Sequence, residues 1–183
     1  MKEEIIIAGF GGQGVLSMGK ILAYSGIMQD KEVTWMPSYG PEMRGGTANV
    51  TVIISDNKIS SPVLAKFDTA IILNQQSMDK FEHAVKSGGL LIYDPNGITR
   101  HPARRDITVC AIEAADESAK LGNAKTYNMI VMGAFLKMKP ILSMENIIKG
   151  LKKSIPERNH HLINANEQAI ETGMDKVKIL NKI

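Results

Sequence analysis

The order of apolar and polar residues along the chain predicts strands that alternate with helices. Ile5–Ala8 form a continuous apolar run, which is typical of a strand buried on both faces. After a glycine-rich turn, apolar residues recur at helical spacing from Val15 to about Met28 and predict the first helix. Apolar and β-branched runs predict five further strands, at Val33–Met36, Thr47–Ile54, Thr69–Asn74, Leu90–Tyr93 and Ile107–Ile112.

Helical spacing predicts the remaining elements, and the alternation sets the fold class. Helices are predicted at about Gln76–Lys86, near Glu117, and at Thr126–Met138, Ser143–Lys153 and about Asn159–Leu180. This order favours an α/β fold, a Rossmann-like three-layer sandwich with a mostly parallel, partly mixed sheet and a helical C-terminal layer. A hairpin predicted within Thr47–Ser60 makes the sheet mixed. With 183 residues and no linker, residues 1–183 are expected to form a single domain.

Composition narrows the function classes. A net charge of +3, with Lys and Arg scattered, argues against a nucleic-acid partner. No apolar run is long enough for a membrane span, the acidic start is unlike a signal peptide, and a single cysteine without a disulfide partner predicts a reducing cytoplasm. The one cysteine, Cys110, lies in an apolar run and predicts a buried thiol. It excludes an intrachain disulfide and an iron–sulfur cluster held by this chain alone.

A first glycine-rich motif follows the first strand. Gly9, Gly11 and Gly14 spell G-x-G-x-x-G between a predicted strand and a predicted helix. Glycines there allow backbone N–H groups to approach an anion, and the helix N-terminus adds partial positive charge. The motif predicts an anionic ligand group at this turn. The alternative, that the glycines only permit a tight turn, remains open.

Two nucleotide-binding interpretations of this turn are disfavoured. A dinucleotide site normally has an acid at the end of the second strand, but Asp30 and Glu32 precede that strand here. Gly14, Gly19 and Lys20 also fit the triphosphate-binding G-x-x-x-x-G-K pattern. That pattern requires Ser or Thr next, where this chain has Ile, and Lys20 is predicted to lie more than one turn into the helix.

A second glycine-rich stretch, "YGPEMRGG" at residues 39–46, follows the second strand. Its position beyond the carboxyl end of a strand is typical of ligand-binding loops in α/β sheets. Arg44 has the planar fork that binds a carboxylate or a phosphate, and Tyr39 can stack on a ring. The alternative is a local ion pair between Glu42 and Arg44 on the surface.

Together, "GFGGQGV" and "YGPEMRGG" resemble the gamma subunit of 2-oxoacid:ferredoxin oxidoreductases. Further matching pieces are Leu22-Ala23, Ser61-Pro62, Asp68 and the segment "YNMIVMGA" at 127–134. The resemblance covers essentially the whole chain. It implies a non-cofactor subunit of a complex that decarboxylates a 2-oxoacid such as 2-oxoglutarate, 2-oxoisovalerate or pyruvate, forms an acyl-coenzyme A and reduces ferredoxin.

The resemblance also implies partners and a site. Thiamine diphosphate and Mg²⁺ belong to the alpha and beta subunits, and iron–sulfur clusters to the beta or a ferredoxin-like subunit. This chain is expected to hold none of them and no catalytic residue or metal, but to pack on its partners and help bind coenzyme A. The residues implied at that site are Gly11, Gly12, Gln13, Gly14, Tyr39, Gly40, Glu42, Arg44 and Gly45.

Other polar residues receive simpler interpretations, and two alternative functions stay open. Asn128 is expected to cap a helix. The four histidines lack ligand spacing and are expected to be surface or core residues; adjacent His160 and His161 would point about 100° apart on a helix. The alternatives are a stand-alone nucleotide-binding protein and a purely structural subunit. Isolated, the chain is a candidate homodimer.

Overall fold

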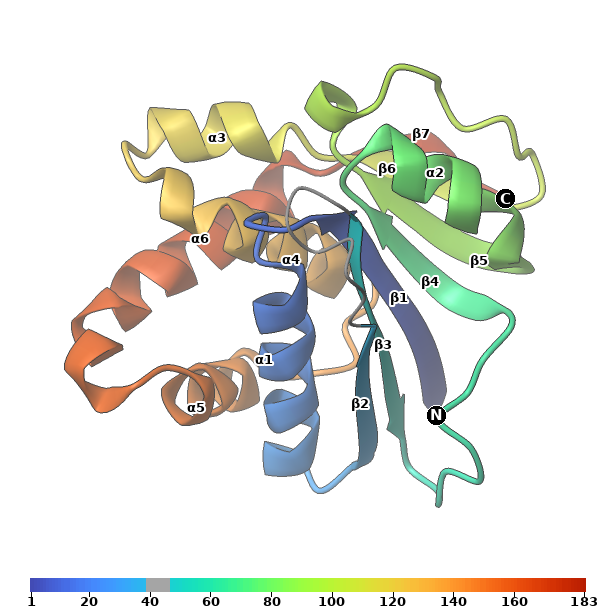
Figure 1. The fold of residues 1–183 in the computed structure, drawn as a ribbon. Helices are drawn as coiled ribbons and strands as arrows, with labels where there is room; N and C mark the ends of the chain where they lie inside the picture. Colours follow the sequence, from blue (N-terminus) through green and yellow to red (C-terminus); the bar gives the residue numbers. More distant parts are fainter. Residues whose placement is uncertain (39–46) are drawn as a thin grey trace.

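A seven-stranded mixed sheet forms the centre of the protein in a computed structural model that describes residues 1–38 and 47–183 (Figure 1). The strands lie in the order β2 (Glu32–Ser38), β3 (Thr47–Ser55), β1 (Lys2–Phe10), β4 (Phe67–Ile72), β5 (Val85–Tyr93), β6 (Thr108–Ala111) and β7 (Lys178–Asn181). Neighbours from β1 to β6 are parallel, whereas β3 is antiparallel to both β1 and β2, and β7 is antiparallel to β6. The α/β class and the mixed sheet are therefore confirmed.

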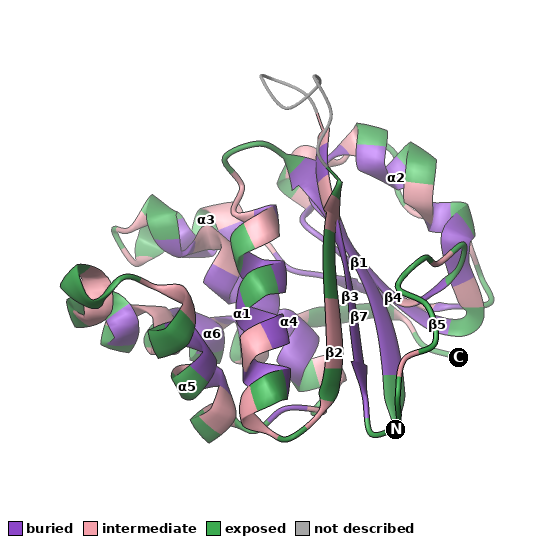
Figure 2. Ribbon diagram, turned by 60° about the horizontal axis from the view of Figure 1, so that its bottom comes forward, coloured by how far each residue is buried: buried purple, intermediate pink, exposed green. Residues whose placement is uncertain are grey.

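Helices cover both faces of this sheet (Figure 2). One face carries α1 (Val15–Met28), α3 (Ala114–Lys120), α4 (Tyr127–Met138), α5 (Met144–Ser154) and α6 (Ile163–Lys176); the other carries α2 (Gln75–Phe81) and η2 (Glu82–Ala84). Three short helical turns, η3 (Pro95–Gly97), η4 (Ala124–Thr126) and η5 (Glu157–Leu162), complete the described elements. None of the helices in these two described ranges is long and apolar enough to cross a membrane.

A hydrophobic core lies on each face of the sheet, and the continuous apolar run of β1 contributes side chains to both, as its composition predicts. Ile5 and Ile7 point to the side of α1 and α4, while Ile6 points to the side of α2. All three are at most 1% exposed. Because successive side chains of a strand point to opposite faces, an unbroken apolar run is what a central, doubly covered strand requires.

Helices α4 and α6 contact each other at two glycines, one on each helix. A Cβ built on Gly133 would overlap the carbonyl oxygen of Ile170, and one built on Gly173 would overlap the carbonyl oxygen of Ile130. Each neighbour is backbone, which cannot rotate out of the way. The two helices therefore approach each other so closely only because these positions have no side chain.

Three element predictions are wrong in detail. The hairpin predicted within Thr47–Ser60 does not form: β3 instead pairs with β1 and β2, and no strand follows it before Phe67. The helix predicted to reach Lys86 ends as a short η turn, and Val85 already begins β5. The C-terminal helix stops at Lys176, and residues Lys178–Asn181 form β7 on the edge of the sheet.

Candidate functional site

The first glycine-rich motif forms a strand-to-helix turn at the carboxyl edge of the sheet. β1 ends at Phe10, and α1 begins at Val15. Gly12 and Gly14 have φ angles of 95° and 73°, in the left-handed region that favours glycine. Gly14 is the N-cap of α1, and no side chain caps the helix there. The N–H groups of the first turn and the positive end of the helix dipole are thus available to a ligand at this edge.

The side chain of Gln13 braces this turn from within. Its Oε1 accepts a hydrogen bond from the N–H of Phe10 at 2.6 Å, and its Nε2 donates to the carbonyl of Leu73 at 3.2 Å. A Cβ at Gly9 would collide with this Oε1 and with Leu73. Gln13 therefore ties β1 to the end of β4, and its predicted role toward a ligand stays a prediction.

The glycine turn lies where two neighbouring parallel strands are followed by helices on opposite faces of the sheet. The connection after β1 places α1 on one face of the sheet, and the connection after the neighbouring parallel strand β4 places α2 on the other (Figure 2). In open α/β sheets, ligands bind in the crevice that such diverging connections leave at the carboxyl ends of the strands. The glycine turn is one wall of that crevice.

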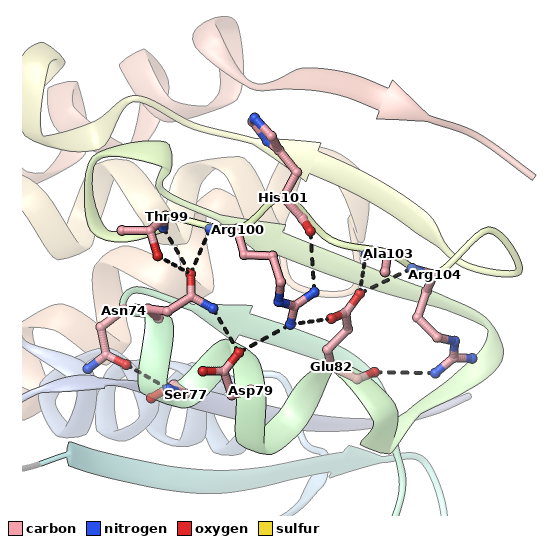
Figure 3. Close-up of polar contacts among 10 residues, drawn as sticks. Asn74, Ser77, Asp79, Glu82, Thr99, Arg100, His101, Ala103 and Arg104 are labelled. Atoms are coloured by element: carbon pink, nitrogen blue, oxygen red, sulfur yellow. Dashed lines mark hydrogen bonds and ion pairs between the residues drawn. The ribbon is translucent and has the colours of Figure 1, made fainter.

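Sequence reasoning missed a buried polar pair on the β4 side of the crevice. Asn74 is 0% exposed and follows β4; its Oδ1 accepts a hydrogen bond from the N–H of Ser77 at 2.8 Å, which caps α2 (Figure 3). Within the described residues, Asn74 Nδ2 and Ser77 Oγ have no hydrogen-bond partner. An Asn directly after a buried strand was the available signal, because Asn is a favoured N-cap residue.

Asn128 joins the turn from the opposite end of the sequence. Its Nδ2 donates to the carbonyl oxygen of Gly14 at 3.3 Å, and a Cβ on Gly14 would collide with its side chain. The expectation that Asn128 caps a helix is wrong, because the N-cap of α4 is Thr126 and Asn128 already lies inside the first turn. The start of α4 therefore packs directly against the glycine turn.

Asp94 links the next strand to α3 and α4. It follows β5, is 1% exposed, and accepts hydrogen bonds from the N–H groups of Asn96 at 2.9 Å and Ala115 at 3.2 Å. Burial raises the pKa of Asp94 even though these N–H groups and the Tyr127 hydroxyl favour its charged form. Burial, together with Asp94, also raises the pKa of Tyr127 well above its usual range. Buried Asp94 and half-buried Tyr127 thus connect β5, α3 and α4 around the turn.

A polar cluster on the α2 side fixes the segment that follows η3 (Figure 3). Gln75 Oε1 accepts hydrogen bonds from the N–H of Thr99 at 2.9 Å and of Arg100 at 2.8 Å. Glu82 Oε2 accepts one from Arg100 at 2.9 Å, and Glu82 Oε1 accepts one from the N–H of Arg104 at 3.1 Å. These donors and acceptors satisfy one another, so the cluster has a structural role.

His101 and His160 have structural partners, and Cys110 is buried. His101 Nδ1 lies 3.3 Å from the Tyr93 hydroxyl, and His160 Nε2 lies 3.0 Å from the carbonyl oxygens of both Lys152 and Ile155. Cys110 is buried as predicted, and burial raises the pKa of its thiol to about 11. Across residues 1–38 and 47–183, no group of three or more His, Cys, Asp or Glu side chains is arranged to hold a metal ion.

The structure brings together one part of the predicted site. Gly11, Gly12 and Gly14 form the turn at the carboxyl edge, and Gln13 supports it from inside. The predicted residues Tyr39, Gly40, Glu42, Arg44 and Gly45 lie outside the described residues. Their described flanks lie at the same edge, since Thr47 pairs with Phe10 and Ser38 pairs with Asn49.

Several known proteins share this sequence pattern over most of the chain. The chain is 35% identical over 162 residues to 2-oxoglutarate synthase subunit KorC of Methanocaldococcus jannaschii, covering 86% of each chain. It is 32% identical to KorC of Methanothermobacter marburgensis, covering 94% of this chain and 99% of the relative. It is also 36% identical to ketoisovalerate oxidoreductase subunit VorA of Methanothermobacter thermautotrophicus over 74% of this chain, but spans only 28% of that longer protein.

Solved structures share the fold, and a family match covers nearly the whole sequence. The keto/oxoacid ferredoxin oxidoreductase gamma subunit from Geobacter sulfurreducens superposes with a TM-score of 0.82 at 29% identity, covering 96% of each chain. A 2-oxoglutarate:ferredoxin oxidoreductase from Magnetococcus marinus shares the fold at 21% identity and a TM-score of 0.85, over 95% of this chain and 30% of that one. Residues 4–176 match the family described as pyruvate ferredoxin/flavodoxin oxidoreductase, and with these relatives the match shows that the chain belongs to that family.

Proposed function

We propose that this chain is the gamma subunit of a multi-subunit 2-oxoacid:ferredoxin oxidoreductase, with residues 1–183 as a single gamma-type domain. The carrying observation is the end-to-end similarity to KorC, which is a subunit of 2-oxoglutarate synthase and has nearly the same extent as this chain. The partial match to VorA supports the view that the same domain also occurs as one segment of a longer subunit. The substrates consistent with these relatives are 2-oxoglutarate, 2-oxoisovalerate and pyruvate.

In this proposal the chain supplies no catalytic residue. Thiamine diphosphate, Mg²⁺ and iron–sulfur clusters would belong to alpha, beta and ferredoxin-like partner subunits in the cytoplasm, and ferredoxin would accept the electrons. The single cysteine is consistent with this division, because clusters need several thiolate ligands. The chain alone is therefore inactive, and co-expression with such partners yields coenzyme A-dependent reduction of ferredoxin.

The glycine turn is proposed to contribute to a coenzyme A site. The turn exposes the first N–H groups of α1 and the positive end of its dipole, where a phosphate or another anion is stabilised. The flanks of the second motif lie beside the turn. One protein with this fold, the Magnetococcus marinus enzyme, was solved with coenzyme A and succinyl-CoA bound. The proposed residues remain those of the two motifs, with Arg44 as the cationic group toward the ligand.

The role of Arg44 can be tested in the assembled complex. Loss of one charge-assisted contact with a phosphate costs about 1.5–3 kcal/mol, so Arg44→Ala should raise the KM for coenzyme A at least about tenfold. The KM for the 2-oxoacid should stay unchanged. Arg105→Ala is a matched control, because Arg105 is exposed beside the amino end of β6, the opposite edge of the sheet. An unchanged KM for coenzyme A in Arg44→Ala, with normal assembly, would refute this role.

The stand-alone nucleotide-binding alternative makes a different prediction. Calorimetric titration of the isolated chain with NAD, NADP and FAD should give no saturable heat if the chain is a gamma subunit. Tight binding of one of these cofactors by the isolated chain would favour the alternative. A purely structural subunit would instead show weaker assembly in Arg44→Ala without a selective change in the KM for coenzyme A.

A further inference from the structure

The edge of the sheet at β2 is an apolar surface that nothing in the described residues covers. There β2 pairs only with β3, and Figure 2 shows it at the margin of the sheet, beside α1. Between β2 and α1 lies a hollow of about 280 Å³, lined by Lys20, Ala23, Tyr24, Ile27, Val33 and Trp35. Ile27 is 50% exposed and Trp35 is 38% exposed. An exposed apolar edge strand is a template for pairing with another chain.

The outward backbone groups of β2 are arranged for an antiparallel neighbour. Pro37 lies in register with Val50 of β3 but has no N–H, so its ring nitrogen faces away from β3, as is usual for a proline on an edge strand. Backbone groups alternate in direction along a strand, so the N–H and C=O groups of Val33 and Trp35 also face outward. If two β2 strands pair antiparallel about Thr34, Val33 of each lies opposite Trp35 of the other. Each strand then supplies the donors and acceptors that its neighbour requires.

The residue at the centre of this register has an unsatisfied hydroxyl. Thr34 Oγ1 is buried and has no hydrogen-bond partner within the described residues. In the register centred on Thr34, the same residue of a second copy lies directly opposite. Two threonines in this position can share a hydrogen bond once one hydroxyl turns toward the other by rotation about χ1. A second copy therefore offers this oxygen a partner.

The charges beside the hollow are also self-complementary. Lys20 lies next to Trp35, and Asp30 follows the other end of α1. Neither takes part in an ion pair in the part of the chain that the structure describes, whereas Lys31 pairs with Asp56. A two-fold axis at the centre of the paired strands makes the two α1 helices antiparallel, so the lysine of each helix lies toward the aspartate of the other. Opposite charges that meet in this way favour a copy of the same surface.

We propose that isolated chains associate through β2 as a two-fold symmetric dimer, in which the two sheets join and the α1 helices pack over the joint. Tyr24, Ile27 and Trp35 supply the apolar contacts. Both protomers use the same patch, so association closes at two copies. The patch contains none of the turn residues Gly11–Gly14, and the proposal does not depend on the proposed gamma-subunit role.

Sedimentation velocity of the full chain measures this association. Between about 1 and 100 µM, a range typical of moderate affinity, the mass should rise from the 20.0 kDa of one chain toward twice that value. Trp35 is the only tryptophan, so intrinsic fluorescence reports on this edge. Its emission should shift to longer wavelength on dilution, over the same concentrations at which the mass falls, because the ring becomes exposed again.

Substitutions on the patch locate the interface. Ile27→Lys and Trp35→Lys each replace an exposed apolar side chain by a cation and should raise the dissociation constant of the dimer at least about tenfold. Lys20→Glu should also raise it, because a carboxylate then faces Asp30 of the second copy. Leu180→Lys is the matched control, since Leu180 is 55% exposed on β7, the opposite edge strand. Thermal melting checks that each variant is folded, and Ile27→Lys carries the test if Trp35→Lys is not.

Three results would overturn the proposal. A chain that stays at 20.0 kDa at the highest concentration would show that a second copy is not the occupant of this edge. An unchanged dissociation constant in both Ile27→Lys and Lys20→Glu would show that the dimer forms elsewhere. Dissociation by Leu180→Lys, with none by Ile27→Lys, would place the interface on β7.

Discussion

Replacement of Gly133 by alanine tests the close crossing of α4 and α6. A Cβ there would lie much closer than 3.0 Å to the carbonyl oxygen of Ile170, a separation that Cβ atoms in proteins essentially never show. Ordinary van der Waals contact begins at 3.4 Å. The obstacle is helix backbone, so relief requires the two helices to move apart by on the order of 1 Å. A radial gap of that size forfeits roughly a quarter to a half of each dispersion contact across the interface.

The expected cost follows from two opposing contributions. Overpacking of a well-packed core costs roughly 1–3 kcal/mol, and a backbone obstacle places Gly133→Ala at or above the upper end of that range. Alanine is a better helix former than glycine by roughly 1 kcal/mol, which offsets part of the cost. The net loss of about 2 kcal/mol corresponds to a fall in Tm of about 4–8 °C for a chain of this length.

Thermal unfolding followed by far-UV circular dichroism measures this shift. Asn164→Ala is the matched control: Asn164 is exposed on α6, and alanine there gains helix propensity without meeting a neighbour. Its Tm should be unchanged or slightly higher. A Gly133→Ala protein that melts at or above the wild-type temperature would refute the close crossing, because helix propensity alone would then decide the outcome.

Three further predictions concern the turn, an ion pair and the buried thiol. Asn128→Ala removes the amide that donates to the Gly14 carbonyl and should lower Tm by about 2–4 °C; an unchanged Tm would show that the contact contributes nothing. The Arg104 guanidinium is the largest cause of the low pKa of the Asp106 carboxyl, about 2, so in Arg104→Gln a ¹³C titration should show this pKa raised toward 3.8. The stability from that pair is present above pH 3.8 and is lost as pH falls toward about 2; an unmoved titration would contradict the pairing. Because burial raises the pKa of Cys110 to about 11, a thiol reagent at about pH 8 should label the native protein far more slowly than the denatured one, and equal rates would contradict its burial.

The elements predicted best from sequence are those whose pattern is set by burial alone. The apolar run of β1 and the helical spacing of α1 predicted a buried strand and its helix, because a central strand requires a continuous apolar run and a packed helix requires apolar residues at helical spacing. β7 was missed because its four residues, Lys178–Asn181, have no alternating pattern and follow α6 without a turn signal, so that pairing with β6 decides their conformation. Tertiary contacts override local preference at such edges.

The site was predictable where backbone conformation demands a residue type, and less so where contacts are distant in sequence. Left-handed φ angles at Gly12 and Gly14 explain why the motif could be recognised from glycines alone. The contacts of Gln13 with Leu73 and of Asn128 with Gly14 join residues far apart in the chain. No local spacing encodes such contacts, and only the folded sheet brings these residues together.

The strand order gives a physical reason, independent of the missing acid, why this turn departs from a dinucleotide site. In the dinucleotide-binding fold, the second strand lies directly beside the first, so an acid at its end reaches the ribose next to the glycine turn. Here the antiparallel β3 lies between β1 and β2, which moves the end of β2 to roughly 10 Å from β1 at the usual strand spacing.

That insertion has a second consequence for the site. Because β3 runs antiparallel to β1, its first residue, Thr47, pairs with Phe10, the last residue before the glycine turn. The preceding strand ends at Ser38 on the same edge. Thr47 therefore lies beside the end of β1, where a dinucleotide-binding protein presents its ribose-binding acid, and Ser38 lies one strand further out. The same inserted strand that removes a ribose site thus holds Ser38 and Thr47, the described residues on either side of the second glycine-rich motif, at the edge of the sheet where the first motif lies.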